Sequence, residues 1–177
     1  PSGGVEPEEL FALARKAGPL SMFAAPTIVK RLVDDAEAHG ETGEGFKTIV
    51  YGGAPMYAAD IERALRVMGP RFVQIYGQGE TPMVATALSR HHLADSGHPR
   101  HAERLASVGV AQTPVQLRVT DAQGRELPVG AVGEVGVKGD SVMAGYWHNP
   151  DATTAALREG WLFTGDVGCL DADGFLT

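Results

Sequence analysis

The pattern of hydrophobic and polar residues changes near residue 105. Up to residue 76, stretches with apolar residues three or four positions apart alternate with short continuous apolar runs. The first spacing is typical of helices with one buried face, and the short runs are typical of buried strands. Regular alternation of the two predicts an α/β fold, a parallel sheet flanked by helices. We expect one helix to begin at Pro7, a second to begin at Pro26 and a third to contain Ile61, Ala64, Leu65 and Met68. The strands are expected at 20–24, 46–51 and 72–76.

The first helix carries a candidate core face. Leu10, Leu13, Ala14 and Ala17 recur at i, i+3, i+4 and i+7, the spacing of one helical stripe. Gly18-Pro19 is expected to end this helix. We therefore expect these four side chains to pack inward.

Beyond residue 105 the period becomes two. Apolar and polar side chains alternate in 115–119 and in 134–138, which predicts half-buried strands. A short helix is expected from Pro150 to Gly160, and two short strands around a tight turn at 171–174. This part is predicted to be a small, mainly antiparallel β subdomain. The expected division is residues 1–105 and 106–177.

Residues 91–104 contain four histidines and are expected to form a polar loop. His91, His92, His98 and His101 lack helical spacing, and no cysteine or acid pair is near them. A solvated loop is therefore favoured over a metal site.

Composition narrows the class of protein. The chain has 177 residues, of which 44% are apolar, so it can build a proper core. A net charge of -7 argues against a nucleic-acid partner. The single cysteine excludes an internal disulfide and fits a reducing compartment. No apolar run approaches the ~18 residues that a membrane span needs, and no leader is recognised, so we expect a soluble, cytoplasmic protein.

Two predicted strands end in glycine turns, Tyr51-Gly52-Gly53-Ala54-Pro55 and Tyr76-Gly77-Gln78-Gly79-Glu80. In an open α/β sheet, ligands bind beyond the carboxyl ends of the strands. A flat ring, accessible backbone and one metal-capable acid at that edge suit a nucleotide that carries Mg²⁺. The alternative is a pair of ordinary turns with Glu80 solvated.

Thr164-Gly165-Asp166 is a second candidate. A carboxylate at a strand end can accept two hydroxyl hydrogen bonds, as from a ribose diol. An aspartate that merely forms a turn is the commoner case.

Five segments together resemble the adenylate-forming superfamily, and most closely its acyl-CoA synthetases. They follow the order of that family and span residues 52–166. The segments are Gly52-Gly-Ala-Pro55, Tyr76-Gly-Gln-Gly-Glu80, Gly133-Glu-Val, Gly145-Tyr-Trp-x-Asn-Pro-Asp-Ala-Thr153 and Gly160-Trp-Leu-Phe-Thr-Gly-Asp166.

The resemblance implies a role for each site residue. The glycine turn of the first segment would line the adenine, Tyr76 would stack on it, and Asp166 would bind the ribose hydroxyls. Glu80 would be the catalytic acid that holds Mg²⁺ against the phosphates of ATP. The adenine-lining residues would be Gly53, Ala54 and Pro55, with main-chain contacts from Gly77 and Gln78.

The implied reaction joins a small carboxylic acid to ATP as an acyl-adenylate and then passes the acyl group to coenzyme A. Two departures qualify it. The family usually has a hydroxyl residue just before the acid, where this chain has Gly79, so Thr81 or a water would have to replace it. The family's phosphate loop, hinge arginine and C-terminal lysine are expected upstream of residue 1 and beyond Thr177. The chain is therefore expected to be a fragment that is inactive without the missing parts of its parent.

Two other functions stay open. The parent could be an adenylation domain that loads a carrier protein, or the chain could be a non-catalytic α/β binding module. The sequence does not identify the acid, and an oligomer is possible.

Overall fold

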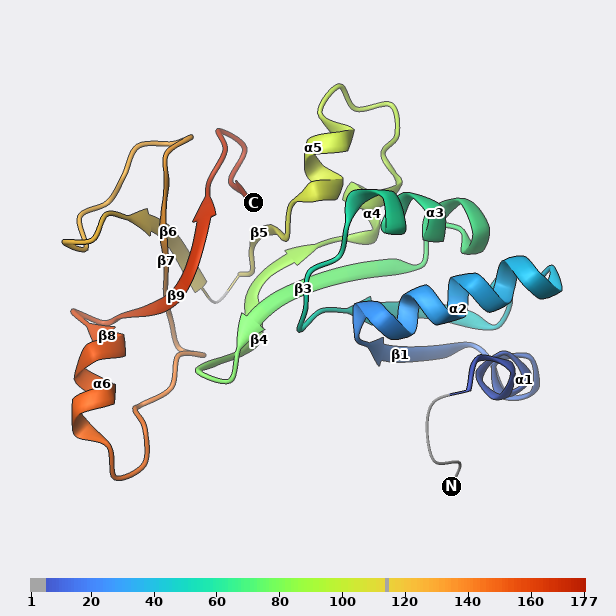
Figure 1. Ribbon diagram of the computed structural model, residues 1–177, viewed down its shortest axis with the longest axis horizontal. Helices are drawn as coiled ribbons and strands as arrows, with labels where there is room; N and C mark the ends of the chain where they lie inside the picture. Colours follow the sequence, from blue (N-terminus) through green and yellow to red (C-terminus); the bar gives the residue numbers. More distant parts are fainter. Residues whose placement is uncertain (1–5, 114) are drawn as a thin grey trace. The chain divides into compact units, whose positions relative to one another are not determined.

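The computed structural model describes residues 6–113 and 115–177, and the chain divides into two compact units (Figure 1). The first unit contains the chain up to Gln74 and residues 88–106, and the second contains 75–87 and 107–177. The chain passes from the first to the second inside strand β3 (Phe72–Gln78). The second unit therefore includes residues 75–87, where β3 turns into the next strand, a hairpin that the sequence pattern grouped with residues 1–105. The division at residue 105 stays a prediction for the parent protein.

The first unit is the expected parallel sheet with helices. Strand β2 (Phe46–Tyr51) lies between β1 (Leu20–Ala24) and β3 and pairs in parallel with both. Helix α2 (Pro26–His39) packs against α1 (Pro7–Ala17) and α3 (Ala58–Met68). The predicted parallel sheet is thus confirmed. Its core is built from side chains with at most 1% exposure, including Val29, Leu32, Ile49, Ile61 and Phe72.

The predicted inner face of α1 is correct for Ala14 and wrong for Leu13 and Ala17. The buried residues are Pro7, Phe11 and Ala14, whereas Leu13 is 49% exposed and Ala17 is also exposed. The ring of Phe11 meets that of Phe46 edge to face at 5.6 Å. Because an aromatic side chain buries more apolar area than the leucines beside it, Phe11 sets the rotation of the helix.

The stretch expected to be a polar loop contains helices instead. Helix α4 (Arg90–Ala94) and helix α5 (His101–Ala106) each anchor one leucine, Leu93 or Leu105, and both leucines are 1% exposed. The side chain of Ser89 caps α4 by accepting a hydrogen bond from the amide of His92 at 3.2 Å. One buried residue per helix is too weak a periodic signal to find in the sequence.

The second unit is mainly antiparallel, as predicted. Strand β4 (Thr81–Leu88) pairs with β5 (Gly109–Ala111), and β5 pairs with β10 (Phe175–Leu176). A separate sheet has the order β6-β7-β9-β8. Its strands are β6 (Val115–Thr120), β7 (Val132–Gly139), β8 (Leu157–Arg158) and β9 (Trp161–Cys169).

Helix α6 (Pro150–Ala156) starts where the sequence indicates, because the side chain of Asn149 accepts a hydrogen bond from the amide of Ala152 at 3.1 Å. It ends before the expected Gly160, since Leu157 and Arg158 pair with β9. Among the residues that the structure describes, no helix has the length and apolarity to span a bilayer.

Candidate nucleotide-binding site

Five of the predicted site residues, Tyr76, Gly77, Gln78, Glu80 and Thr81, come from the β3–β4 hairpin. Gly77 permits its tight geometry: a Cβ atom there would lie 2.6 Å from the Cα of Met83. Met83 itself has a positive φ of 56°, which marks local backbone strain. Gly79 differs, because a Cβ atom there would meet nothing within 4 Å and its φ is not positive. Gly77 is therefore a steric requirement of the hairpin, and Gly79 is not.

Asp166 lies in a bulge of strand β9. Glu134 of β7 pairs with Val167, and Gly136 pairs with Phe163, so three residues of β9 lie opposite the single residue between them. Gly165 adopts a left-handed φ of 74° in this bulge. Bulges of this kind redirect a side chain away from the ladder. Here the redirected side chain is that of Asp166, which is exposed.

Thr164 stabilises the bulge. Its hydroxyl donates to the carbonyl of Val135 at 2.9 Å and accepts from the amide of Asp166 at 3.1 Å. The amide of Gly165 donates to the carboxylate of Glu134 at 3.0 Å. These bonds satisfy backbone groups that the irregular ladder leaves without strand partners.

The structure brings Tyr76, Gln78 and Asp166 together although they are far apart in sequence. The hydroxyl of Tyr76 donates to Oδ2 of Asp166 at 2.6 Å, and the amide Nε2 of Gln78 donates to the same oxygen at 2.8 Å. The same amide nitrogen lies 3.0 Å from the carbonyl of Thr164. A ring and a carboxylate therefore lie one hydrogen bond apart.

The ring of Tyr76 is supported from within the unit. It packs against the core cluster that includes Val119, Val135 and Leu162, yet the residue keeps part of its surface exposed. Burial first, and then the hydrogen bond to Asp166, raise the pKa of the Tyr76 phenol. Tyr76 is therefore a neutral donor at any ordinary pH.

Glu80 makes a second tyrosine–carboxylate pair. The hydroxyl of Tyr146 donates to Oε1 of Glu80 at 2.6 Å. This bond is the main reason why the pKa of the Glu80 carboxyl lies below its ordinary value. Glu80 is thus an ionised carboxylate that accepts a hydrogen bond from Tyr146.

Thr81 is the predicted replacement for the hydroxyl that the chain lacks at Gly79. Its side chain is fully buried, and its Oγ1 lies 3.3 Å from Oγ of Ser141. A phosphate contact by Thr81 stays a prediction, and in this structure the residue anchors the hairpin internally through this buried contact.

The first-unit residues Gly53, Ala54 and Pro55 form the exposed turn between β2 and α3. A Cβ atom at Gly53 would meet no heavy atom within 4 Å, so space does not require glycine there. Its left-handed φ of 81° does, because other residues rarely adopt that conformation. The predicted convergence of this turn with the Tyr76 hairpin stays a prediction.

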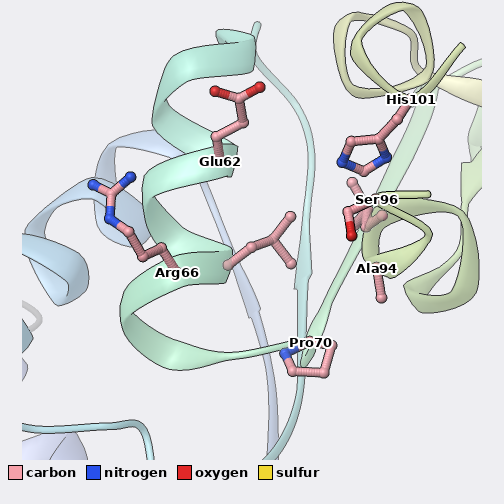
Figure 2. Close-up of a pocket in the computed structure, with 8 residues that line it drawn as sticks. Glu62, Arg66, Pro70, Ala94, Ser96 and His101 are labelled. Atoms are coloured by element: carbon pink, nitrogen blue, oxygen red, sulfur yellow. The ribbon is translucent and has the colours of Figure 1, made fainter. Parts of the chain in front are cut away.

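A pocket of about 420 Å³ lies in the first unit, among residues that the sequence did not predict (Figure 2). Glu62 and Arg66 come from α3, whereas Ser96 and His101 come from the segment that contains α4 and α5. Its other lining residues are Leu65, Pro70, Leu93 and Ala94. No predicted site residue lines this pocket.

The residues present fit Mg²⁺ only if a bound nucleotide and water supply most of its ligands. Among the described residues, no group of three or more His, Cys, Asp or Glu side chains could hold a metal. Mg²⁺ bound with a nucleotide commonly uses one or two carboxylates, with phosphates and water as its other ligands. The single carboxylate of Glu80 fits that arrangement and no closed protein cage.

Sequence reasoning missed two supporting residues. Tyr146 lies within a recognised segment but received no role, because its partner Glu80 is 66 positions away. Gln78 was expected to contribute only its main chain, whereas its side chain binds Asp166. The segment Gly145-Tyr-Trp was the available signal for Tyr146.

Comparison with known proteins defines the class. Residues 2–147 match the family described as AMP-binding enzyme, and the chain belongs to that family. A medium/long-chain-fatty-acid–CoA ligase of Mycobacterium tuberculosis is 32% identical over 96% of this chain and 28% of its own length. A fatty acid–[acyl-carrier-protein] ligase of Streptomyces coeruleorubidus is 33% identical over 93% of this chain and 31% of its own length.

Solved structures agree with this assignment. The amide bond synthetase McbA of Marinactinospora thermotolerans matches with a TM-score of 0.84 and 33% identity, over 97% of this chain and 33% of that one. The α/β fold with its antiparallel β unit is therefore that of adenylate-forming enzymes. The chain spans about a third of the length of the proteins that it matches.

Proposed function

We propose that this chain is the ATP- and AMP-binding part of an AMP-forming acid–thiol ligase. The parent enzyme activates a carboxylic acid as an acyl-adenylate and transfers the acyl group to coenzyme A. Membership of the AMP-binding enzyme family supports the nucleotide. The similarity to a fatty acid–CoA ligase supports the acid and the acceptor, with fatty acids as the first substrates to test.

One observation carries the proposal: the Tyr76 hydroxyl lies 2.6 Å from Asp166 Oδ2. A nucleoside presents a flat base and a ribose diol a short distance apart, so a ring and a carboxylate joined by one hydrogen bond match both parts. Tyr76 stacks on the adenine with its exposed face. Tyr76 and Gln78 both donate to Oδ2, so we assign Oδ1 to the ribose hydroxyls.

The remaining nucleotide contacts follow the family pattern. By that pattern, Gly53, Ala54 and Pro55 would line the adenine, and the main chain at Gly77 and Gln78 would contribute hydrogen bonds. The exposed, left-handed backbone at Gly53 supports close approach by a ligand.

Glu80 is the proposed catalytic acid, acting through Mg²⁺. When bound, the ion would neutralise phosphate charge while the acid substrate attacks the α-phosphorus. The residues of this chain would position the nucleotide and supply no nucleophile. The depressed pKa of the Glu80 carboxyl supports this role, because an ionised carboxylate is the form that binds a cation.

Coenzyme A is preferred to a carrier protein as the acyl acceptor. The sequence of the segment Gly160-Trp-Leu-Phe-Thr-Gly-Asp166 resembles that of the CoA enzymes. One relative, however, is named for a carrier-protein substrate. Because the chain spans about a third of its relatives, we expect it to be inactive without the rest of its parent. The single free thiol, Cys169, supports function in a reducing compartment such as the cytoplasm.

The decisive experiment is ATP–pyrophosphate exchange by the full-length parent with Mg²⁺ and a panel of carboxylic acids. Exchange that depends on one class of acid is the expected result. Absence of exchange with every acid would overturn the proposal. Product analysis with coenzyme A and with a phosphopantetheinyl carrier protein, supplied separately, then identifies the acceptor.

Tyr76→Ala in the same protein tests the adenine contact. Nucleotide affinity should fall by on the order of 1 kcal/mol or more, the scale of a lost aromatic stacking contact. Tyr57→Ala is the matched control, because Tyr57 is 74% exposed and has no role in the proposed site. Equal affinity of the Tyr76→Ala protein and the wild type would favour a non-catalytic α/β module.

A further inference from the structure

The segment 141–146 contacts the turn of the β3–β4 hairpin at three successive points. Oγ of Ser141 lies 3.3 Å from Oγ1 of Thr81. The amide of Met143 donates to the carbonyl of Glu80 at 2.8 Å, and the hydroxyl of Tyr146 donates to Oε1 of the same residue at 2.6 Å. The segment therefore holds both the main chain and the side chain of Glu80.

Helix α6 in turn fixes Tyr146. The amide of Tyr146 donates to Oγ1 of Thr153 at 2.9 Å, and that hydroxyl donates to the carbonyl of Asn149 at 2.8 Å. Gly145 makes this approach possible, because a Cβ atom there would lie 2.8 Å from Cγ2 of Thr153. Val142 and Met143 also pack against the core cluster of the unit. The tyrosine is thus held by covalent neighbours that are themselves packed.

A partly exposed glutamate without such a partner would sample several rotamers, and ordering it on ligand binding would cost conformational entropy. A hydroxyl that donates to Oε1 removes much of that freedom before a ligand arrives. It also fixes the position of Oε1, the oxygen that accepts this hydrogen bond. A phenylalanine would fill the same space but could not do this.

We propose that Tyr146 is a positioning residue that orients the Glu80 carboxylate for the metal–nucleotide complex. This inference rests on the proposed function, because it assumes that Glu80 binds the ion. Tyr146 touches neither the ion nor the reacting atoms. It acts through Glu80, with Gly145 and Thr153 fixing its own position.

The experiment compares Tyr146→Phe with wild type in the full-length parent. Mn²⁺ serves as a spectroscopic probe for Mg²⁺, and its affinity in the presence of a non-hydrolysable ATP analogue is measured by electron paramagnetic resonance. We expect about tenfold weaker Mn²⁺ binding, the scale of a lost hydrogen bond to a charged group. In exchange assays, the Mg²⁺ concentration at half-maximal rate should rise, whereas the rate at saturating Mg²⁺ should change less.

A double-mutant cycle separates positioning from general damage. In a Glu80→Gln background, Tyr146→Phe should weaken Mn²⁺ binding by less than about twofold, because the carboxylate through which it acts is gone. An equal loss in both backgrounds would overturn the inference. Tyr57→Phe removes a hydroxyl from an exposed tyrosine and should change neither affinity nor rate.

A second pair of variants guards against misfolding of Tyr146→Phe. Thr153→Ala removes the hydroxyl that accepts a hydrogen bond from the amide of Tyr146, and Thr153→Ser keeps that hydroxyl. Thr153→Ala should weaken Mn²⁺ binding in the same direction as Tyr146→Phe, and Thr153→Ser should restore it. If Mn²⁺ binding is unchanged both in the Thr153→Ala protein and in the Tyr146→Phe protein, the inference is contradicted. Failure of wild-type exchange with every acid would instead contradict the proposed function, since Mn²⁺ affinity is measured independently of exchange.

Discussion

Two tyrosine–carboxylate pairs of the second unit have the same contact distance but different support. Tyr76 meets Asp166, and Tyr146 meets Glu80, each with 2.6 Å between the hydroxyl and carboxylate oxygens. Tyr76 belongs to a strand and packs against the core, whereas Tyr146 is 39% exposed and lies in a loop. In the first pair the sheets fix both partners, and in the second a packed loop fixes an acid in a turn.

This difference indicates what each pair contributes. The first pair offers a ring surface and a carboxylate at a set distance, the geometry on which the proposed nucleotide site depends. The second pair offers one oriented charge, so its value depends on the hydroxyl alone. Removing the ring of Tyr76 should therefore weaken the first pair's proposed ligand binding most. Removing the hydroxyl oxygen of Tyr146 alone should be enough to impair the second pair.

The largest expected effect comes from removing the charge of the second pair. Glu80→Gln should lower the exchange rate of the parent enzyme by about 10²–10³-fold, the scale found when one electrostatic group at a reaction centre is lost. The measurement is ATP–pyrophosphate exchange with the best acid of the panel. A loss of less than about threefold would mean that Glu80 is only a surface residue, and the comparison between the pairs would fail.

The next effect tests the strand that carries the first pair. Gly77→Ala should lower the free energy of unfolding by about 1–3 kcal/mol, because the new Cβ atom overlaps the backbone of Met83. Gly79→Ala is the matched control two positions away and should change it by less than about 0.5 kcal/mol. Chemical denaturation followed by fluorescence measures both. Similar losses in the two variants would show that the hairpin does not require this close approach.

Alkaline pH should distinguish the pairs further. Burial and Asp166 raise the pKa of Tyr76, and the hydrogen bond to Glu80 raises that of Tyr146, both from an ordinary value of 10.0. The folded state therefore retains these protons when the unfolded chain has begun to release its own. Stability from each tyrosine is fully present below pH 10 and declines as the pH rises above that value.

The expected alkaline loss is larger for Tyr76, because its ring is partly buried. Tyr76→Phe should flatten the decline of unfolding free energy above pH 10 more than Tyr146→Phe does. Denaturation midpoints measured at a series of pH values provide the comparison. The opposite order would mean that the exposed pair is the more strongly coupled to folding.

The smallest expected effect is that of Gly79→Thr on stability, within about 0.5 kcal/mol of wild type, because the site is open. The substitution supplies a hydroxyl just before Glu80, where members of the adenylate-forming superfamily usually have one. We expect a lower KM for ATP in the parent enzyme, with Gly79→Val as the control that has the same shape and no hydroxyl. Equal KM values for the two variants would show that the hydroxyl has no phosphate contact here.

The sequence predicted the first unit well because its elements are long and strongly patterned. Helix α2, for example, repeats its apolar residues over its whole length, and the strand at 46–51 coincides with the predicted one. The errors fall where one side chain outweighs a pattern. Phe11 rotates α1 away from the expected face, and Leu93 and Leu105 each anchor a short helix within a polar stretch.

For the candidate site, the sequence indicated Tyr76, Glu80 and Asp166 as candidate residues, but not the hydrogen bonds that join Tyr76 to Asp166 and Tyr146 to Glu80. A residue type and a turn are local properties, so they can be recognised in a single segment. The bond from Tyr76 to Asp166 and the bond from Tyr146 to Glu80 join positions 90 and 66 residues apart. Only the pairing of β7 with β9, and the packing of segment 141–146 against the hairpin, determine which hydroxyl meets which carboxylate.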